Sequence, residues 1–541
     1  MQDHARSSSR SDNEPWWKAG LLYQIYVRSF ADTDGDGVGD LGGVLDRLDY
    51  LSWLGVDGIW LSPITVSPNA DWGYDVSDYR KVQPEYGTLA DLDEVVAAAN
   101  SRGIHVLIDL VPNHTSNLHS WFSDSASSRD AGHRDFYVWA DPTSDGSPPN
   151  NWVGCFGGPA WTFDEHTGQY YLHNFLPEQP DLNWWSEDVR REFDDILRFW
   201  WDRGIEGFRI DVCSMIIKDA QLRDNPPATE DDPFIMQMFG QRPEFTSNRP
   251  EVHDVIRHWR QIANGYNSPR VLLGETNVES LETLVSYYGL GEDELHLAFN
   301  FTFIEAPFEA KALREIVERT EELLPARAWP VWTGSNHDVS RLATRWAAGD
   351  PAKTRLALLM LLSLRGTPVL YQGDEIGLTD VDLGREDIRD PVGLRFWPAY
   401  RGRDAARTPM PWTTGAGGGF SSADATPWLP MGDPEACNVA DQRDRPGSLL
   451  AFIRDLVALR KGSADLTSGS YRSIPSPDGT WLFGRGAGTV VALNMSGSPT
   501  KASLPGTSYE VAMSTDLSRA ETGADGGVEL DPWEGMVLIP S

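Results

Sequence analysis

The chain has 541 residues, of which 40% are hydrophobic and 11% are aromatic. Such a length exceeds one ordinary hydrophobic core, so we expect two or three domains. The 80 Asp and Glu residues outnumber the 46 Lys and Arg residues, and the net charge is -34. This charge disfavours binding to nucleic acid or to an anionic membrane surface.

Cysteine usage and the N-terminus indicate the compartment. Cys155, Cys213 and Cys437 lie far apart without metal-like spacing, which indicates reduced thiols in a reducing compartment. Residues 1–15 are polar and Ser-rich and lack the apolar core of a signal peptide, and no run approaches the ~20 apolar residues of a membrane span. We expect a disordered tail over residues 1–15, a cytoplasmic location, and a monomer or small homo-oligomer.

The first elements alternate between strands and helices. Leu21–Tyr26 reads as a strand, and a stripe of apolar residues from Val44 to Leu54 predicts a helix that ends at Gly55. A strand, a helix and another strand follow at Val56–Pro63, 89–102 and Ile104–Leu110. Five further strands are predicted downstream, at Gly207–Val212, Arg270–Glu275, Leu295–Phe303, Val331–Trp332 and Thr367–Tyr371.

Eight apolar strands separated by helices predict a (β/α)8 TIM barrel, an α/β fold whose chemistry lies at the carboxyl ends of the strands. We assign residues 16–112 and 181–465 to this barrel. Residues 113–180 are rich in Trp, Gly, Pro, Asn and His without clear periodicity, and we interpret them as a subdomain inserted after the third strand. Short alternating runs split by Gly and Pro predict a C-terminal antiparallel β domain over residues 466–541.

An acidic loop follows the first strand. Carboxylates alternate with other residues from Asp32 to Asp40, and three glycines allow the loop to curl. Oxygen atoms at positions 1, 3, 5, 7 and 9 of such a loop can converge on one hard cation. A solvated acidic turn is the alternative, but so much like charge in nine residues favours a counterion.

The predicted strand Gly207–Val212 carries an unusual pair. Arg209 and Asp211 alternate with apolar residues, so both side chains point to the same face. A charge pair on a buried strand is costly unless its groups are satisfied. By itself the pair fits a buried salt bridge as well as a functional site.

Further polar residues fall at other strand ends. Asp109 and His114 accompany the third strand, Glu275 closes the fifth, and His337 and Asp338 follow the seventh. Each has an ordinary reading as a helix cap or a hydrogen-bonded core residue. Together they place several carboxylates at one barrel rim, and two facing carboxylates suit glycoside chemistry, one as nucleophile and one as proton donor.

These polar residues belong to four stretches that follow one another along the chain: Asp109-Leu-Val-Pro-Asn-His114, Gly207-Phe-Arg-Ile-Asp211, Gly274-Glu275 and Asn336-His337-Asp338. The four stretches resemble, in the same order, the motifs of the α-amylase family of glycoside hydrolases (family 13). Gln179-Pro-Asp-Leu-Asn183 resembles a motif of its oligo-1,6-glucosidase and α-glucosidase branch. The segments Asp57–Pro63 and Gly366–Asp374 also match, so the similarity covers nearly the whole chain.

The resemblance implies three catalytic roles. Asp211 would be the nucleophile, Glu275 the general acid and base, and Asp338 the carboxylate that holds the sugar and stabilises the transition state. Arg209 would keep Asp211 ionised through its adjacent charge. Retention of configuration then needs carboxylates ~5–5.5 Å apart.

The resemblance also implies binding residues. Asp71 and Tyr74 would close the blind end of a glucose pocket, and His114 and His337 would hold ring hydroxyls. The implied pocket wall comprises Phe156, Phe175, Gln179 and Arg407. The implied metal ligands are Asp32, Asp34, Asp36, Asp40 and the carbonyl of Val38, around one structural Ca²⁺ or Mg²⁺, and no organic cofactor is expected.

We therefore expect a retaining, exo-acting α-glucosidase that acts on short α-glucosides through a covalent glucosyl-enzyme. A transglucosidase or a maltose-to-trehalose isomerase would use the same carboxylates, and a non-catalytic binding homologue is a remote alternative. Val212, directly after the nucleophile, resembles the residue that accompanies α-1,6 specificity in this branch. Its rigid β-branched side chain would narrow the space for a 4-linked ring; simple packing against a helix is the alternative.

Overall fold

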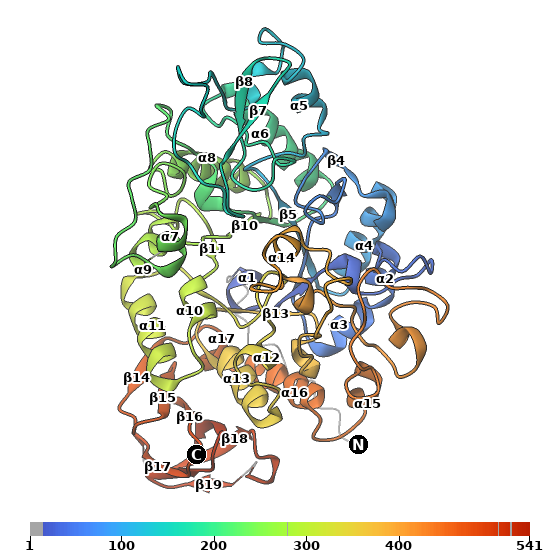
Figure 1. The fold of residues 1–541 in the computed structure, drawn as a ribbon. Coiled ribbons are helices and arrows are strands. Elements are labelled where there is room, and N and C mark those ends of the chain that lie inside the picture. Colours follow the sequence, from blue (N-terminus) through green and yellow to red (C-terminus); the bar gives the residue numbers. More distant parts are fainter. Residues whose placement is uncertain (1–14, 279, 507, 520–521) are drawn as a thin grey trace.

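The computed structural model describes residues 15–278, 280–506, 508–519 and 522–541 (Figure 1). The predicted disordered tail over residues 1–15 therefore lies, except for Pro15, outside the described residues. Among the described residues, no helix is both long and apolar enough to cross a bilayer.

Eight parallel strands form the central sheet, in the order β11-β10-β9-β5-β2-β1-β13-β12. A parallel bridge between Phe299 and Val331 joins its two edges and closes the barrel. The prediction of a (β/α)8 barrel is thereby confirmed, and all eight predicted strands are present. Their bounds are β1 (Leu22–Ile25), β2 (Gly58–Leu61), β5 (His105–Leu110), β9 (Gly207–Ile210), β10 (Val271–Gly274), β11 (Leu297–Ala298), β12 (Val331–Thr333) and β13 (Thr367–Tyr371).

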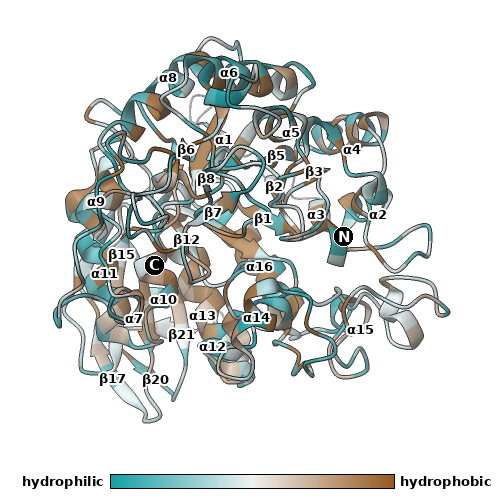
Figure 2. Cartoon of the chain, turned by 45° about the horizontal axis from the view of Figure 1, so that its top comes forward, coloured by the Kyte–Doolittle hydropathy of each residue, from teal (hydrophilic) through white to brown (hydrophobic). Residues whose placement is uncertain are grey.

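Helices surround this barrel and pack against it, and α13 (Pro351–Ser363) is buried on nearly all sides. In Figure 2 hydrophobic residues follow the central strands, whereas α6 and α8 carry hydrophilic residues as well. This arrangement fits amphipathic helices that cover a sheet buried on both faces. The principal helices are α2 (Leu41–Asp46), α3 (Leu48–Leu54), α4 (Leu89–Ser101), α6 (Glu187–Asp202), α8 (Val252–Asn264), α9 (Leu281–Ser286), α10 (Phe301–Glu305), α11 (Ala310–Leu323), α12 (Leu342–Arg345), α13 (Pro351–Ser363) and α16 (Leu449–Gly462).

Five of the eight strands end earlier than predicted, and for two of them a local cause is visible. The sixth strand stops at Ala298 because Asn300 caps α10, its side chain accepting the amide hydrogen of Phe303 at 3.1 Å. The fourth stops at Ile210 because Val212 takes a left-handed backbone conformation with φ 36°. Gly55 ends α3 as predicted, with φ 91°.

The segment between β5 and α6 forms a small sheet of its own, with order β6-β8-β7. Trp152, Ala160, Trp161 and Leu172 form a separate buried cluster there. This part lies at the top of Figure 1. Its elements are α5 (Ser120–Ser125), β6 (Trp139–Ala140), β7 (Trp161–Asp164) and β8 (Gln169–Leu172). A hairpin of β3 (Thr65–Val66) and β4 (Asp78–Val82) precedes α4.

The C-terminal part is an antiparallel β structure, as predicted, and lies at the bottom of Figure 1. Its larger sheet has the order β14-β15-β16-β21-β18-β19, and β17 pairs with β20. Barrel helix α13 packs against β21. The strands are β14 (Tyr471–Ile474), β15 (Thr480–Arg485), β16 (Thr489–Asn494), β17 (Thr500–Ser503), β18 (Tyr509–Ser514), β19 (Gly523–Ala524), β20 (Gly527–Leu530) and β21 (Gly535–Pro540).

Candidate active site

One arginine joins three carboxylates at the strand ends. Arg209 on β9 places Nη1 2.6 Å from Asp109 and 2.7 Å from Asp211, and its Nη2 lies 2.9 Å from Glu275. Asp109 comes from β5, whereas Asp211 and Glu275 directly follow β9 and β10. Neighbouring parallel strands thus bring together the groups that the sequence predicted at one rim.

Burial dominates the electrostatics of Asp211. It raises the pKa of this carboxyl well above its usual range, and Arg209 opposes that rise while Glu275, Asp109 and Asp338 add to it. Arg209 therefore acts in the expected direction, toward the ionised form of Asp211, and burial opposes it. The same guanidinium is shared among Asp109, Asp211 and Glu275.

Glu275 is held by the backbone as well as by Arg209. The amide N–H of Val212 donates to its Oε2 at 2.8 Å. Val212 reaches this position with φ 36°, in a region that a β-branched residue adopts only under strain. Such a conformation persists where the surrounding structure imposes it. Here it directs the Val212 N–H toward the Glu275 carboxylate.

Asp338 lies beside two arginines, and its pKa is shifted in the opposite direction from that of Asp211. Arg407 Nη2 lies 2.6 Å from its Oδ1, and Arg403 Nη1 lies 3.3 Å from the same oxygen. Although burial opposes it, His337, Arg403 and Arg407 hold the pKa of Asp338 well below its usual range. This carboxylate is therefore ionised near pH 7.

Asp71 lies at a polar end of the site. Its Oδ1 is 2.7 Å from Arg403 Nη2, and Gln179 Nε2 donates to its Oδ2 at 3.2 Å. Only 3% of Asp71 is exposed. Arg403 thereby bridges Asp71 and Asp338, two carboxylates that the sequence analysis assigned to the same sugar.

Two buried histidines lie between these groups. Burial lowers the pKa of His114 to about 4 and that of His337 to about 3, so both rings are neutral near pH 7. Tyr74 stacks on His337 and places its hydroxyl 2.5 Å from Nε2. His114 Nε2 is 3.0 Å from Gln179 Nε2. Neutral rings in these positions can hydrogen-bond hydroxyl groups.

Aromatic rings line the same site. Phe175 contacts both His114 and Phe156, with ring centroids 5.1 and 5.3 Å away. The Arg403 guanidinium lies 5.4 Å from the Phe156 ring centre. The structure thus brings together all thirteen residues that the sequence analysis assigned to catalysis and sugar binding.

The sequence analysis missed Arg403 and its partner Asp390. Asp390 is fully buried and its Oδ1 lies 2.7 Å from Arg403 Nη2. Arg407, the arginine chosen from the sequence, instead contacts Asp338 and the carbonyl oxygen of His337. The only signal for Arg403 was its position four residues before Arg407, in a loop without periodicity.

The acidic loop lies between β1 and α2. Carboxylate oxygens of Asp32, Asp34 and Asp40 lie within 4.8 Å of one another. Asp36 is not part of that group among the described residues and accepts the amide hydrogen of Val38 at 2.8 Å. Three carboxylates in one place, two of them buried, form a donor set that suits a hard cation.

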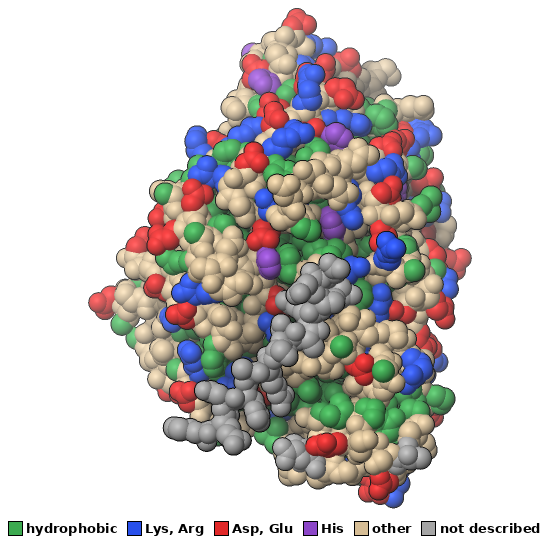
Figure 3. All heavy atoms as spheres, turned by 180° about the vertical axis from the view of Figure 1, so that it is seen from behind, with side chains coloured by type: hydrophobic (Ala, Val, Ile, Leu, Met, Phe, Trp, Pro, Cys, Tyr) green, Lys and Arg blue, Asp and Glu red, His purple; other side chains and the backbone are tan. Residues whose placement is uncertain are grey.

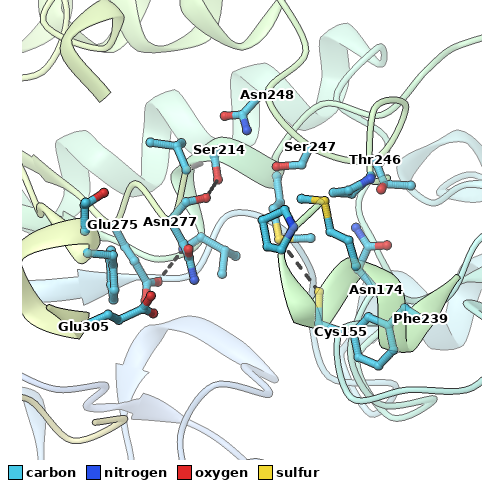
Figure 4. Close-up of a pocket in the computed structure, with 18 of the residues that line it drawn as sticks. Cys155, Asn174, Ser214, Phe239, Thr246, Ser247, Asn248, Glu275, Asn277 and Glu305 are labelled. Carbon is cyan, nitrogen blue, oxygen red and sulfur yellow. Dashed lines mark hydrogen bonds between the residues drawn. The ribbon is translucent and has the colours of Figure 1, made fainter. Parts of the chain in front are cut away.

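A cavity of about 900 Å³ adjoins Glu275. Glu275 and Val212 line it, whereas Asp71, Asp211 and Asp338 do not. Figure 4 shows Glu275 and Glu305 at one end of the cavity and Cys155 and Phe239 at the other. The site therefore has a polar end at Asp71 and a large hollow beyond Glu275.

Comparisons with known proteins agree with this geometry. The α-amylase catalytic domain family matches residues 24–469. A probable α-glucosidase of Rhizobium meliloti is 41% identical over 484 residues, 86% of either chain. An oligo-1,6-glucosidase of Heyndrickxia coagulans is 38% identical over 506 residues, 86% of this chain and 89% of the relative.

A solved structure shares the whole architecture. The α-glucosyl transfer enzyme XgtA superposes with a TM-score of 0.91 at 40% identity, covering 98% of this chain and 100% of that one. A non-catalytic homologue is thereby set aside, because the relatives are named enzymes and the three carboxylates are in place. The chain belongs to the α-amylase family of glycoside hydrolases and is a glycosidase of its α-glucosidase type.

Proposed function

We propose that the protein is a retaining, exo-acting α-glucosidase that releases glucose from the non-reducing end of short α-glucosides. The observation that carries this proposal is the asymmetry of the site. Asp71 and Arg403 form a buried ion pair at one end, and the large cavity begins at Glu275 on the other. A site closed behind one sugar ring and open beyond the scissile bond suits removal of single terminal units.

The roles of the carboxylates follow from their surroundings. Asp211 attacks the anomeric carbon and forms a glucosyl ester, while Glu275 protonates the departing oxygen and later takes a proton from water. Asp338, held ionised by Arg403 and Arg407, binds sugar hydroxyls and stabilises the positive charge that develops on the ring. Neutral His114 and His337 hold further hydroxyls.

Proton NMR of the products tests this proposal. Maltose, isomaltose, sucrose and trehalose are each supplied as sole substrate, and the first glucose released should be the α-anomer, which then mutarotates. Initial release of β-glucose would exclude the retaining mechanism, and internal cleavage of longer oligosaccharides would exclude exo-action.

Transfer of glucose to an acceptor other than water is a second candidate activity. XgtA, the solved relative, is described as an α-glucosyl transfer enzyme, and the cavity beside Glu275 has room for an acceptor molecule. The glucosyl-enzyme would react with an acceptor hydroxyl in place of water, with Glu275 taking the proton.

We also propose that the acidic loop binds one structural Ca²⁺ or Mg²⁺. Asp32, Asp34 and Asp40 supply the cluster of carboxylates, and Asp36 and the Val38 carbonyl complete the implied ligand set. The bound cation would neutralise the like charges of the loop. Only Asp34 of the three clustered residues is exposed, so the ion would be largely enclosed.

A further inference from the structure

His337 is fully buried, and aromatic neighbours hold its ring in place. Tyr26 and Tyr74 stack on it with ring centroids 5.7 and 5.3 Å away. Trp60 meets the ring edge-on at 6.0 Å. Packing of this kind fixes the plane of an imidazole ring, but it does not decide which of the two ring nitrogens carries the proton. That choice depends on the hydrogen-bond partners of each nitrogen.

The Nδ1 atom of His337 faces Gln24, a residue of β1. Gln24 Nε2 lies 2.8 Å from this nitrogen, and it also donates to Ser62 Oγ at 3.1 Å. The Gln24 side chain is fully buried, so water does not compete for these contacts. An amide nitrogen can only donate a hydrogen bond. Nδ1 therefore accepts from Gln24 and carries no proton.

The group on the other side of the ring leads to the same assignment. Asp338 Oδ2 lies 3.4 Å from His337 Nε2, and the two arginines beside Asp338 keep it ionised, so this oxygen can only accept. Nε2 therefore carries the proton of the neutral ring. Reversal of the Gln24 amide would demand a proton on Nδ1 instead. It would also place two N–H donors where Gln24 Oε1 has no hydrogen-bond partner among the described residues.

The position of this proton determines what His337 can do in the site. With Nε2 protonated, the ring attracts the Asp338 carboxylate and can donate to the Tyr74 hydroxyl, which lies 2.5 Å away, or to a hydroxyl of an incoming sugar. With the proton on Nδ1, the ring would present a lone pair to an anionic carboxylate, and the two would repel each other.

We infer that Gln24 is a positioning residue of the active site, which donates to Nδ1 of His337 and thereby keeps the ring proton on Nε2, where it faces Asp338 and the sugar. Gln24 acts through His337 and places no net charge in the interior. This inference rests on the proposed α-glucosidase activity. It assigns a part in that activity to β1, a strand from which the sequence analysis took no site residue.

The tautomer is measured in the free protein, without any substrate. The rings of the 11 histidines are labelled with ¹⁵N, and long-range ¹H–¹⁵N correlation spectra distinguish protonated from unprotonated ring nitrogens by their ¹⁵N shifts. The signals of His337 are identified by their loss in His337→Gln or, if that variant fails to fold, in His337→Asn. We expect a protonated Nε2 and an unprotonated Nδ1 near pH 7. A protonated Nδ1 would overturn the inference.

Two buried glutamines on paired strands supply a matched pair of variants. Gln372 directly follows β13 and is as fully buried as Gln24, but its amide contacts the backbone of Tyr26 and Ser29. Gln24→Glu replaces a donor with an acceptor, so Nδ1 of His337 should become protonated. We expect kcat/KM on maltose and isomaltose to fall by about tenfold or more. Gln372→Glu buries a carboxylate equally and should leave the His337 signals as in wild type.

Gln24→Met removes the donor without adding a charge, and it supplies the test if Gln24→Glu fails to fold. The unprotonated Nδ1 of His337 should then show the higher ¹⁵N shift of an acceptor that has lost its donor, and kcat/KM should be several-fold lower. An Nδ1 shift identical to that of wild type would contradict the role of Gln24.

The outcomes separate this inference from the proposed function. Turnover of maltose or isomaltose by a wild type with a protonated His337 Nδ1 refutes only the role of Gln24. Absence of turnover on every α-glucoside refutes the proposed function, and with it the part of Gln24 in the reaction. Equal losses of activity in Gln24→Glu and Gln372→Glu, with the same His337 signals in both, would also overturn the inference, because they would show a general effect of a buried carboxylate.

Discussion

Arg209 shows how much a single residue's environment decides. Its guanidinium lies against Asp109, Asp211 and Glu275 at once, and 1% of its side chain is exposed. With three carboxylates around one cation, burial raises the pKa of Asp211 and also that of Asp109, the latter to about 6. Asp338, which has two arginines, is held ionised instead. Carboxylates of one site thus have opposite protonation tendencies, a pattern typical of acid and base chemistry.

Replacement of the nucleophile should abolish turnover. Asp211→Asn cannot form the glucosyl ester, so kcat/KM on maltose and isomaltose should fall by several powers of ten while the fold and sugar binding remain. Azide or formate added to Asp211→Gly should restore part of the rate by acting as an external nucleophile. Near-normal activity in Asp211→Asn would exclude Asp211 as the nucleophile.

The same variant should change stability in a pH-dependent way. A carboxyl whose pKa is raised by folding destabilises the native state when it is ionised, above the folded pKa, and this cost disappears as pH falls toward the unfolded value of about 3.9. Asp211→Asn should therefore have a higher Tm than wild type at pH 8, with the difference shrinking toward pH 5. A difference that is constant with pH would contradict the raised pKa of Asp211.

Val212 is the residue from which we predict a preference for α-1,6 bonds. Val212 lines the cavity beside Glu275, so it lies where a leaving sugar would pass. Val212→Ala should lower the ratio of kcat/KM for isomaltose over maltose, by a factor that corresponds to about 1–3 kcal/mol. The ratio cancels effects on the common first sugar. A wild type that strongly favours maltose, or an unchanged ratio, would eliminate the steric argument.

At the scale of elements, the loops after the strands build the site and support one another. The acidic loop is tied to the long connection after β13, because the Asp32 amide donates to the Phe420 carbonyl at 2.7 Å and Ser421 donates to the Asp32 side chain at 2.5 Å. That connection also carries Arg403. A cation in the acidic loop would therefore stabilise the segment that completes the sugar pocket.

Chelation should lower Tm more than it lowers the activity of enzyme that stays folded, because a cation that binds only the native state stabilises it by mass action. Asp34→Asn should reduce both metal content and the Tm gain on adding Ca²⁺, whereas the exposed Asp424→Asn should change neither. The measurements are elemental analysis and thermal unfolding with excess chelator. An unchanged Tm together with absence of metal would show that the loop is a solvated acidic turn and not a metal site.

At the scale of the molecule, buried arginines join the barrel to the C-terminal sheets. Arg485 on β15 is fully buried and donates to the carbonyl oxygens of Ser363, Leu466 and Gly469. Ser363 ends barrel helix α13, so this guanidinium satisfies one helix carbonyl on the opposite side of the domain boundary. On the face shown in Figure 3, acidic and basic side chains are interspersed.

Arg485→Met should therefore destabilise the whole molecule. It leaves buried carbonyls without donors, which costs on the order of 2 kcal/mol or more, and Tm should fall by several degrees with kcat/KM of the folded enzyme unchanged. Arg472→Met, at an exposed position on the adjacent β14, is the control and should have little effect. Equal Tm values for the two variants would show that Arg485 does not join the domains.

The sequence alone determined the barrel, the order of its eight strands along the chain and the carboxylates at the strand ends. These features are local: a buried parallel strand must be a short apolar run, and Asp211 and Glu275 are placed by the strands they follow. Tertiary structure decided what no local pattern encodes. The partnership of Arg403 with Asp71 joins positions more than 300 residues apart, and the sharing of Arg209 among three carboxylates depends on the closure of the barrel. The left-handed Val212 and the cavity beside Glu275 likewise depend on how loops pack, because loop side chains take their positions from packing rather than from periodicity.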